Sequence, residues 1–391
     1  MSAVVQVSMV KCPDYRQNSL AQALERGIQP LGGWQKFLHS GDKVLLKVNL
    51  IGPCPPDKAA TTHPELVRVL IQICRAHGCE VWVGDSAGGA IAGLAPTAKG
   101  LRVAGFETVA AEEGATLVNF DQTGAVEVPS KTKRFVDKFY LAKPVRDADV
   151  VINLPKFKAH SAAVFTGAVK NVFGCIPGLR KAEYHRLAPN SEEFGEIIAD
   201  IHLACRVSLN IMDAVVGMEG AGPTAGDPVQ LGYLLLSPDA LALDTVAITA
   251  LGLKLQDVPI LEQAVRLGVG QADLTNIQLC GDFRQIPRIT SFKIPRTVRK
   301  RRSGLMLKGV IRFFKVRPRI NAKLCKHCQV CVGSCPVEAI EPKTKNIDYQ
   351  RCIECLCCHE LCPNQAVILK RSNPVARAVL PLAGRIHRHG T

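Results

Sequence analysis

The chain contains 391 residues, of which 47% are hydrophobic and 21% charged, so it can build a large core and a second, smaller domain. Its formal net charge of +15 resembles that of a nucleic-acid-binding protein, but twelve lysines and arginines lie between residues 293 and 323, where no acidic residue occurs. The rest of the chain is only mildly basic and carries no nucleic-acid recognition motif, so specific nucleic-acid binding is not expected.

Apolar, β-branched runs alternate with helical patterns over the first 290 residues. The strands predicted from these runs are Val4–Val10, Lys43–Leu50, Glu80–Asp85, Thr116–Phe120, Val150–Leu154, Ser208–Asp213 and Gln230–Leu236. The clearest helix is predicted from Pro64 to about His77, with Thr62 or His63 as its N-cap and Gly78 as its stop. Strands that alternate with helices of this length are typical of a mostly parallel sheet sandwiched by helices, so the fold class is predicted to be α/β.

The sequence also predicts where the protein resides. Residues 1–11 alternate like a strand and lack the basic and apolar stretches of a secretion signal. The longest apolar stretch, Leu231–Leu253, is interrupted by Asp239 and Asp244, which argues against a membrane span. Eight of the sixteen cysteines are scattered without metal spacing, as expected for reduced thiols, so a cytoplasmic location is predicted.

Polar residues gather at the ends of the predicted strands, where α/β folds place their functional groups. The segments concerned are K-V-N-L (47–50), G-D-S-A-G-G (84–89), N-L-P-K-F-K-A-H (153–160), T-G-A-V-K-N-V-F-G (166–174) and M-E-G-A-G-P (218–223). Together with His185 they supply several cations, two histidines and flexible glycine backbones. This combination predicts a pocket for an anion.

Individual residues of these segments are assigned roles. The predicted ligand-binding residues are Lys47, Asn49, Asp85, Ser86 and Asn171, and the predicted catalytic residues are Lys156, Lys170, His160 and His185. Lys156, Lys158 and His160 alternate in a strand-like stretch, so they fall on one side and can converge on an anion. Because histidine titrates near neutral pH, both histidines are candidate proton donors.

Structural roles remain as alternatives at each of these positions. Asp85 and Ser86 are also suited to cap a helix, and the lysines to a solvated surface. Cys175 is either a nucleophile or a small buried hydrophobe.

The combination of these segments with the T-T-H-P helix start at 61–64 resembles the family catalogued as domain of unknown function 362. The resemblance covers about residues 3–290, and members of that family often carry a ferredoxin module at the C-terminus. Because the family's activity is not generally established, the resemblance implies an architecture and a site but no reaction. A more distant likeness to the N-terminal half of the lactate-racemase fold adds a racemase- or lyase-like pocket as a non-redox hypothesis.

The basic segment, residues 291–322, is predicted to be a linker. Residues 304–316 carry six apolar side chains among basic ones and are predicted to form a short amphipathic helix. Such a helix can contact an anionic membrane surface peripherally through residues 299–316, or dock an acidic protein partner. The alternative is a solvated linker whose apolar residues pack on the main domain.

One cysteine pattern occurs twice between residues 323 and 371. The two copies, C-x2-C-x2-C-x3-C-P, are offset by 27 residues, and Ala339-Ile340 is echoed by Ala366-Val367, which indicates a duplication. This is the pattern of bacterial two-cluster ferredoxins, in which the fourth cysteine ligates the other cluster. Two [4Fe–4S] clusters are therefore predicted, one held by Cys325, Cys328, Cys331 and Cys362, the other by Cys352, Cys355, Cys358 and Cys335.

Zinc and disulfides are the alternatives, but two such runs exceed what one zinc site needs. Cys357, next to a predicted ligand, either competes for iron or is a buried bystander. Clusters of this kind also predict sensitivity to oxygen.

These observations divide the chain into an α/β domain (1–290), the basic linker (291–322), a small α+β ferredoxin-like domain (323–371) and a basic tail (372–391). The favoured hypothesis is an iron–sulfur oxidoreductase that moves electrons through its clusters to an anionic substrate or cofactor in the Lys/His-rich pocket. The alternative is a non-enzymatic module that delivers electrons to a redox partner protein.

Overall fold

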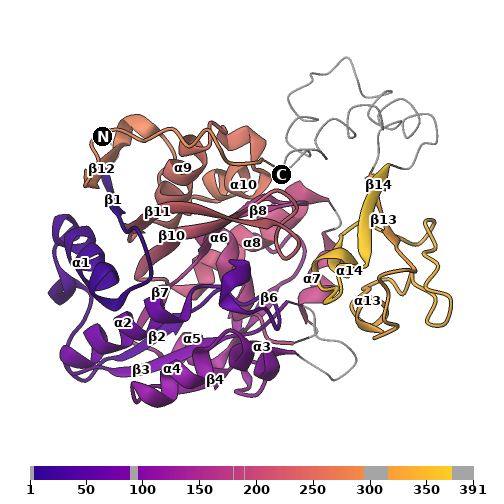
Figure 1. Cartoon of the computed structure of the whole chain (residues 1–391), viewed down its shortest axis with the longest axis horizontal. Coiled ribbons are helices and arrows are strands. Elements are labelled where there is room, and N and C mark those ends of the chain that lie inside the picture. Colours follow the sequence, from indigo (N-terminus) through magenta and orange to yellow (C-terminus); the bar gives the residue numbers. More distant parts are fainter. Residues whose placement is uncertain (1–3, 89–95, 179, 189, 295–315, 372–391) are drawn as a thin grey trace, which may run out of the picture.

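The structure is a computed structural model that describes residues 4–88, 96–178, 180–188, 190–294 and 316–371. Its main body is a mostly parallel sheet with the strand order β12-β1-β11-β10-β7-β2-β3-β4, to which β8 is added beside β10, and β9 beside β8 (Figure 1). The strands are β1 (Val5–Lys11), β2 (Lys43–Lys47), β3 (Glu80–Asp85), β4 (Thr116–Asn119), β7 (Val150–Asn153), β8 (Lys156–His160), β9 (Val164–Thr166), β10 (Leu209–Glu219), β11 (Asp227–Ser237) and β12 (Ile277–Gly281). The predicted α/β fold class is confirmed.

Helices cover both faces of the sheet because its central strands are apolar on both sides. In β2, Val44 and Leu46 belong to one hydrophobic core, while Leu45 between them belongs to the other. The first core is closed by α1 (Gln17–Ile28), α2 (Pro64–Ala76), α3 (Thr97–Val103) and α4 (Phe106–Glu112). The second is closed by α5 (Lys143–Asp147), α6 (Ala168–Asn171), α8 (Ser191–Cys205), α9 (Ala240–Ala250) and α10 (Pro259–Leu267).

All seven predicted strands are present; β3 has the predicted bounds, whereas the ends of the others differ. The strand predicted to reach Leu50 ends at Lys47, because the backbone of Asn49 and Leu50 turns to donate to Thr62 Oγ1 and Asp85 Oδ2. The predicted helix spans Pro64–Ala76, and His63 caps it by accepting from the Glu65 amide. Gly78 follows it at φ +79°, a conformation that favours glycine.

Asp239 and Asp244 belong to the start of α9 but serve different helices. Asp239 caps α9 by accepting from the Ala242 amide. Asp244 accepts instead from the amides of Ala168 and Val169, and so holds the beginning of α6. A Cβ atom on residue 167 would lie 2.1 Å from Asp244 Oδ1, so this close approach requires glycine.

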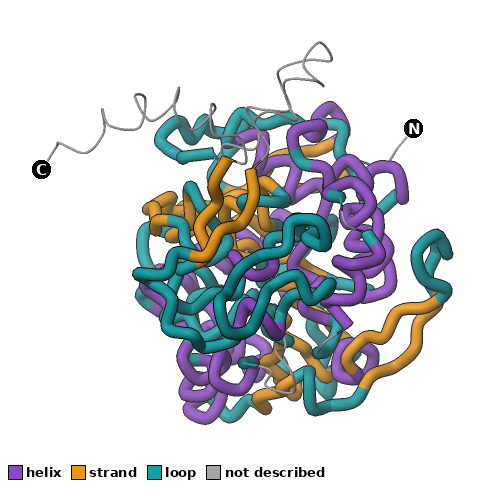
Figure 2. Tube along the Cα trace, turned by 90° about the vertical axis from the view of Figure 1, so that its right-hand side faces the viewer, coloured by secondary structure: helices purple, strands orange, loops and turns teal. Residues whose placement is uncertain are grey.

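A small module lies beside the main body, next to α7 (Arg180–Leu187) (Figure 1). Its strands β13 (Val316–Ile320) and β14 (Val367–Arg371) pair antiparallel, and its short helices are α13 (Val330–Gly333) and α14 (Cys357–Glu360). The rest of the module is mostly loop, as Figure 2 shows. A separate two-stranded hairpin is formed by β5 (Ala125–Pro129) and β6 (Lys138–Ala142), which lie between β4 and α5 in the sequence.

The predicted amphipathic helix at 304–316 lies outside the described residues except for Val316, which begins β13. The basic tail at 372–391 also lies outside them. Within the described ranges, none of the helices combines the length and the apolar character that crossing a membrane requires.

Candidate functional site

Four lysine side chains are buried on or near β2, β8 and α7. Lys47, Lys156, Lys158 and Lys181 are each at most 4% exposed. A buried ammonium group is costly unless a charge or several hydrogen-bond acceptors compensate it, so the partners of each lysine define its role.

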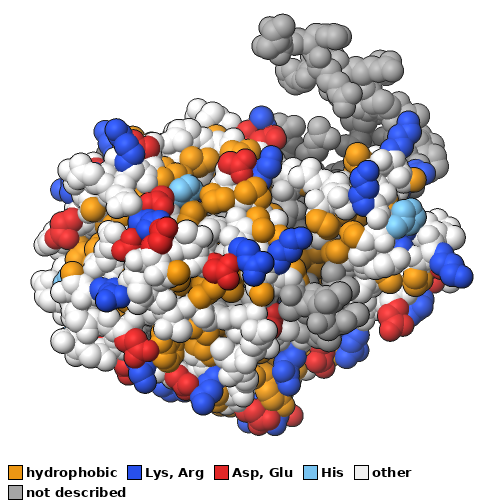
Figure 3. All heavy atoms as spheres, turned by 60° about the horizontal axis from the view of Figure 1, so that its bottom comes forward, with side chains coloured by type: hydrophobic (Ala, Val, Ile, Leu, Met, Phe, Trp, Pro, Cys, Tyr) orange, Lys and Arg blue, Asp and Glu red, His pale blue; other side chains and the backbone are white. Residues whose placement is uncertain are grey.

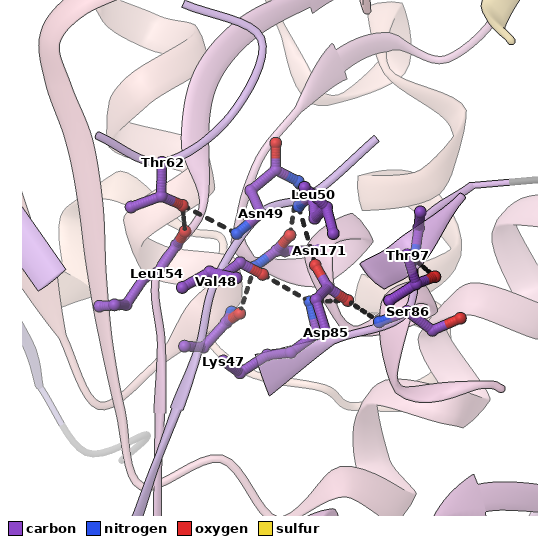
Figure 4. Close-up of polar contacts among 12 residues, drawn as sticks. Lys47, Val48, Asn49, Leu50, Thr62, Asp85, Ser86, Thr97, Leu154 and Asn171 are labelled. Carbon is purple, nitrogen blue, oxygen red and sulfur yellow. Dashed lines mark hydrogen bonds and ion pairs between the residues drawn. The ribbon is translucent and has the colours of Figure 1, made fainter. Parts of the chain in front are cut away.

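Lys47 is compensated by Asp85 at the ends of the neighbouring strands β2 and β3. Its Nζ lies 3.0 Å from Asp85 Oδ1 and donates to the Val48 carbonyl at 2.7 Å (Figure 4). The carboxylate also accepts from the amides of Leu50 and Ser86, so it does not cap a helix. A Cβ atom on residue 174 would lie 2.0 Å from Asp85 Oδ1, which explains the glycine at that position.

Lys156 forms a second buried ion pair and is not among the residues that line the cavities described below. Its Nζ lies 2.7 Å from Asp213 Oδ2 and 2.8 Å from the hydroxyl of Tyr15, which itself donates to Asp213 Oδ1. The prediction that Lys156, Lys158 and His160 converge is corrected at this position. The pairing of β8 with β10 jumps from Asp213 to Met218 between two alternate residues of β8, so regular strand alternation does not hold.

Lys158, Lys170 and Lys181 line one cavity of about 410 Å³, here called the lysine cavity. The other residues in its wall are Asn49, Leu50, Ile51, Asp85, Ser86, Gly88, Thr166, Asn171, Phe173, Gly174 and Pro223. Four of the five residues predicted to bind a ligand thus lie together here, and Lys47 stands behind them as the partner of Asp85.

Lys181 was not predicted from the sequence. It lies on α7, whose sequence RKAEYHRL is charged and suggests an exposed helix, yet its Nζ donates to the carbonyls of Ser86 and Ala87 at 2.8 and 3.0 Å and to the Ser86 hydroxyl. Burial lowers the pKa of Lys181 to about 8, and the nearby carboxylate of Asp121 opposes that shift. The sequence gives little indication that Lys181 is buried, because its hydrogen bond to the Ser86 carbonyl joins residues 95 positions apart.

A continuous chain of asparagine side chains runs from the lysine cavity across the sheet. Asn49 donates to Asn171 (2.6 Å), Asn171 to Asn153 (2.7 Å) and Asn153 to Asn210 (2.8 Å). Asn49 and Asn171 were predicted as ligand-binding residues, whereas the other two extend the chain into the core. The cavity wall is therefore fixed in position by buried hydrogen bonds.

A second cavity, of about 490 Å³, lies between the main body and the small module and is here called the interdomain cavity. Its wall includes His160, Lys170, His185 and Phe194 from the main body and Glu354 and Cys355 from the module. Lys170 belongs to both cavities. Three of the four predicted catalytic residues therefore meet here, and they meet beside a predicted cluster ligand.

Both histidines in this cavity are held neutral. Burial lowers the pKa of His185 to about 3, assisted by the charge of Lys170, and His185 stacks on Phe194 with ring centroids 4.2 Å apart. Burial likewise lowers the pKa of His160 well below its usual value, and its Nδ1 accepts from the amides of Ala162 and Ala163. Both therefore present neutral imidazoles to the cavity near neutral pH, and their role as proton donors stays a prediction.

The eight patterned cysteines line two further cavities in the module. One is walled by Cys325, Cys328, Cys331 and Cys362, and the other by Cys335, Cys352, Cys355 and Cys358. These are the two crossed ligand sets expected from the spacing. Apolar side chains complete the second wall, whereas the first also contains Lys326, Gln329, Lys345 and Asn364. The amides of Ala339 and Ala366 donate to the sulfurs of Cys335 and Cys362 at 3.2 and 3.1 Å.

Two other cysteines noted in the sequence are buried. Cys357 lies at the start of α14 and joins the wall of the second cysteine cavity. Cys175 is completely buried in the main core beside Cys205, which fits a small hydrophobe.

Comparisons with known proteins match both the main body and the small module to known families. A family model described as domain of unknown function (DUF362) matches residues 44–249, and one described as a 4Fe-4S dicluster domain matches residues 317–363. The thylakoid-associated protein sll1697 of Synechocystis sp. (strain ATCC 27184 / PCC 6803 / Kazusa) is 34% identical over 308 residues, which are 76% of this chain and 93% of that protein. A stretch of 53 residues is 45% identical to dihydromethanopterin reductase (acceptor) of Methanosarcina mazei, covering 12% of this chain and 22% of that protein.

Two solved structures show a weaker likeness. The lactate racemase apoprotein from Thermoanaerobacterium thermosaccharolyticum aligns with a TM-score of 0.36 at 12% identity, over 59% of this chain and 54% of that one. A protein from Thermotoga maritima also aligns with a TM-score of 0.36, at 10% identity, over 66% of this chain and 59% of that one.

Proposed function

The chain belongs to the family described as domain of unknown function (DUF362) and carries a 4Fe-4S dicluster domain, and on this premise we propose that it is an iron–sulfur oxidoreductase. In this proposal two [4Fe–4S] clusters serve an anionic substrate or cofactor held by the lysine and interdomain cavities. The observation that carries it is the position of Cys355, which lines both a cysteine cavity and the cavity containing Lys170, His160 and His185.

The residues of the module fit two clusters. Each cavity offers four thiol ligands in the crossed arrangement, and around Cys335, Cys352, Cys355 and Cys358 the other lining groups are apolar, which limits water. A [4Fe–4S] cluster supplies one-electron transfer, at a potential set partly by hydrogen bonds to the ligand sulfurs. The amides of Ala339 and Ala366 are positioned for that role, one in each half of the duplication.

The two cysteine cavities differ in their exposure, which supports a direction for electron delivery. Cys328 is exposed, and its neighbours Lys326 and His327 are also exposed. Lysine, arginine and histidine side chains are visible over the module at the right of Figure 3. An acidic redox protein that supplies or accepts electrons therefore has an outer contact near Cys328, while the substrate has an inner contact near Cys355.

The main body contributes binding and proton control. Lys158, Lys170 and Lys181 attract an anion into a wall already fixed by the asparagine chain. His160 accepts at Nδ1, so in its neutral form Nε2 carries the proton and acts as a donor, while neutral His185 offers one donor and one acceptor; neither adds charge next to the reacting group. Phe194 and Ile260 give the interdomain cavity an apolar side against which a flat or apolar part of the substrate packs.

Anion binding is expected to weaken as the pH rises through about 8, because the pKa of Lys181 in the unliganded protein is lowered to about 8. Below that pH the ammonium is charged, and above it the cavity loses one positive charge. A bound anion favours the charged form, so the midpoint observed in its presence lies above 8. Titration of phosphate affinity between pH 8 and 9.5, where phosphate itself stays a dianion, measures this effect.

The matched variant for this titration is Lys181→Arg, since arginine stays charged over the whole range. Its phosphate affinity should not fall between pH 8 and 9.5. An identical decline in the variant and the wild type would assign the decline to another group.

The proposed function is tested by separating the two cysteine sets. Cys328→Ser and Cys355→Ser should each lose about half of the iron, since each removes a ligand of a different cluster. In the Cys328→Ser protein, the remaining EPR signal of the dithionite-reduced sample should shift when phosphate is added. In the Cys355→Ser protein it should not, because Cys355 alone of the two lines the interdomain cavity.

An electron-transfer module for a protein partner is the second candidate function, and the exposure of Cys328 favours it. This function requires no response of either cluster to a small anion. If phosphate and small carboxylates shift neither EPR signal in the wild type, while an acidic electron-carrier protein reduces the clusters rapidly, the enzyme proposal is wrong and the module proposal holds.

A further inference from the structure

We propose that the lysine cavity selects an oxyanion that also carries a hydrogen-bond donor, such as a hydroxyl group or a protonated oxygen, and that Asn49 recognises this donor. The inference rests on the proposed function, because it concerns the ligand of the same site. It is carried by the chain of hydrogen-bonded asparagines. In this chain the donor and the acceptor atom of each side-chain amide can be assigned in turn.

The direction is set at the far end of the chain. A backbone carbonyl only accepts hydrogen bonds, so an asparagine next to one must present its NH2 group. Asn210 donates Nδ2 to the Ser237 carbonyl at 3.1 Å, and Asn153 donates Nδ2 to the Ala168 carbonyl at 3.0 Å. The oxygen of Asn210 is then the acceptor for Asn153, at 2.8 Å.

The same reasoning continues to the cavity wall. Asn171 donates Nδ2 to the Val48 carbonyl at 3.3 Å and to Asn153 Oδ1 at 2.7 Å. Its own oxygen is left to accept, and Asn49 supplies the donor at 2.6 Å. Asn49 must therefore turn its Nδ2 toward Asn171 and its Oδ1 away from it, as Figure 4 shows. A flipped amide at Asn49 would place two oxygens against each other.

Asn49 lines the cationic cavity, and its oxygen is consequently held as an acceptor on the side away from Asn171. Asn49 is 9% exposed, and among the described residues its Oδ1 atom has no hydrogen-bond partner. Thr166, 3% exposed, lines the same cavity with a hydroxyl that is also unpartnered in the described part of the chain. A buried acceptor left unsatisfied is costly, so a ligand that supplies a donor binds more tightly than one that does not.

The two features of the wall define the ligand class together. Lys158, Lys170 and Lys181 require negative oxygens, and Asn49 requires an O–H or N–H on the same small molecule. A hydroxy-carboxylate or a hydrogen phosphate satisfies both requirements, whereas a plain carboxylate or sulfate satisfies only the first.

The experiment compares matched anions on the full-length, cluster-loaded protein by anaerobic calorimetry at pH 7. Glycolate is matched with acetate, and phosphate with sulfate, because each pair differs in the presence of a donor. The donor-bearing member should bind about tenfold or more tightly in the wild type. In Asn49→Leu this ratio should fall to about one, since the acceptor is gone.

Lys170→Met is the control, because it removes a charge without touching the acceptor. It should weaken all four anions by a similar factor and leave both ratios unchanged. Equal affinities within each pair for the wild type would overturn the inference while leaving the anion site intact. No binding of any of the four would contradict the anion site as well. The wild-type ratios decide the question even where Asn49→Leu fails to fold.

Discussion

Replacing Asp213 by alanine should lower the free energy of unfolding by about 3–5 kcal/mol, the largest stability effect expected for a single residue here. The substitution leaves Lys156, 1% exposed, as an uncompensated charge in the core. It also removes an acceptor for the Tyr15 hydroxyl and for the His63 amide that begins α2. Chemical denaturation of the cluster-loaded protein measures the change, as a shift of the midpoint at unchanged iron content.

The control is the double variant Asp213→Leu, Lys156→Met. Replacing both members of a buried ion pair by apolar residues of similar volume is often nearly neutral, so most of the lost stability should return. A double variant as unstable as Asp213→Ala would show that the ion pair is not the cause. This outcome would assign the loss to the Tyr15 and His63 contacts instead.

Replacing Lys170 by methionine should weaken binding of small anions about 10- to 100-fold, because it removes a charge-assisted contact worth about 1.5–3 kcal/mol. Lys170 is chosen because it lines both the lysine cavity and the interdomain cavity. The iron content should remain normal, since no predicted cluster ligand is changed. Calorimetric titration with phosphate and iron analysis on the same sample measure both quantities.

Lys138→Met provides the matched control for Lys170→Met. Lys138 lies on β6, with its side chain 48% exposed, and pairs with Glu127. Removing it changes the net charge of the protein equally but should leave phosphate affinity within about twofold, as expected for an exposed charge. An equal loss in the two variants would mean that overall charge, not the cavity, governs binding.

The sequence predicted the central sheet well for a physical reason. Strands such as β3 and β7 are buried on both faces, so they appear as short apolar runs bounded by polar turns. The hairpin of β5 and β6 was not predicted, because six of its ten strand residues are exposed or half-buried, so the apolar pattern of a buried strand is weak. β9, with only three residues, is too short to show a pattern.

Site residues at the ends of strands were predicted correctly as neighbours, whereas residues whose contacts depend on loops were missed. Asn49 and Asp85 follow from the rule that polar residues at strand ends gather in α/β folds, and Asn171, at the end of α6, joins them in the cavity wall. The position of Lys156 did not follow, since the irregular pairing between β8 and β10 breaks the alternation. Lys181 could not be found, because its partners are carbonyls brought to it by the loop after β3.

The place of Cys355 in the wall of the interdomain cavity has a thermodynamic consequence. A ligand in that cavity touches the main body through Lys170 and the module through Glu354 and Cys355. Ligand binding and docking of the module are then linked equilibria, and each must favour the other by the same factor. Under the proposed function, occupancy of the site would therefore set how firmly the module is seated, so that binding of the proposed substrate and readiness for electron transfer would become one event.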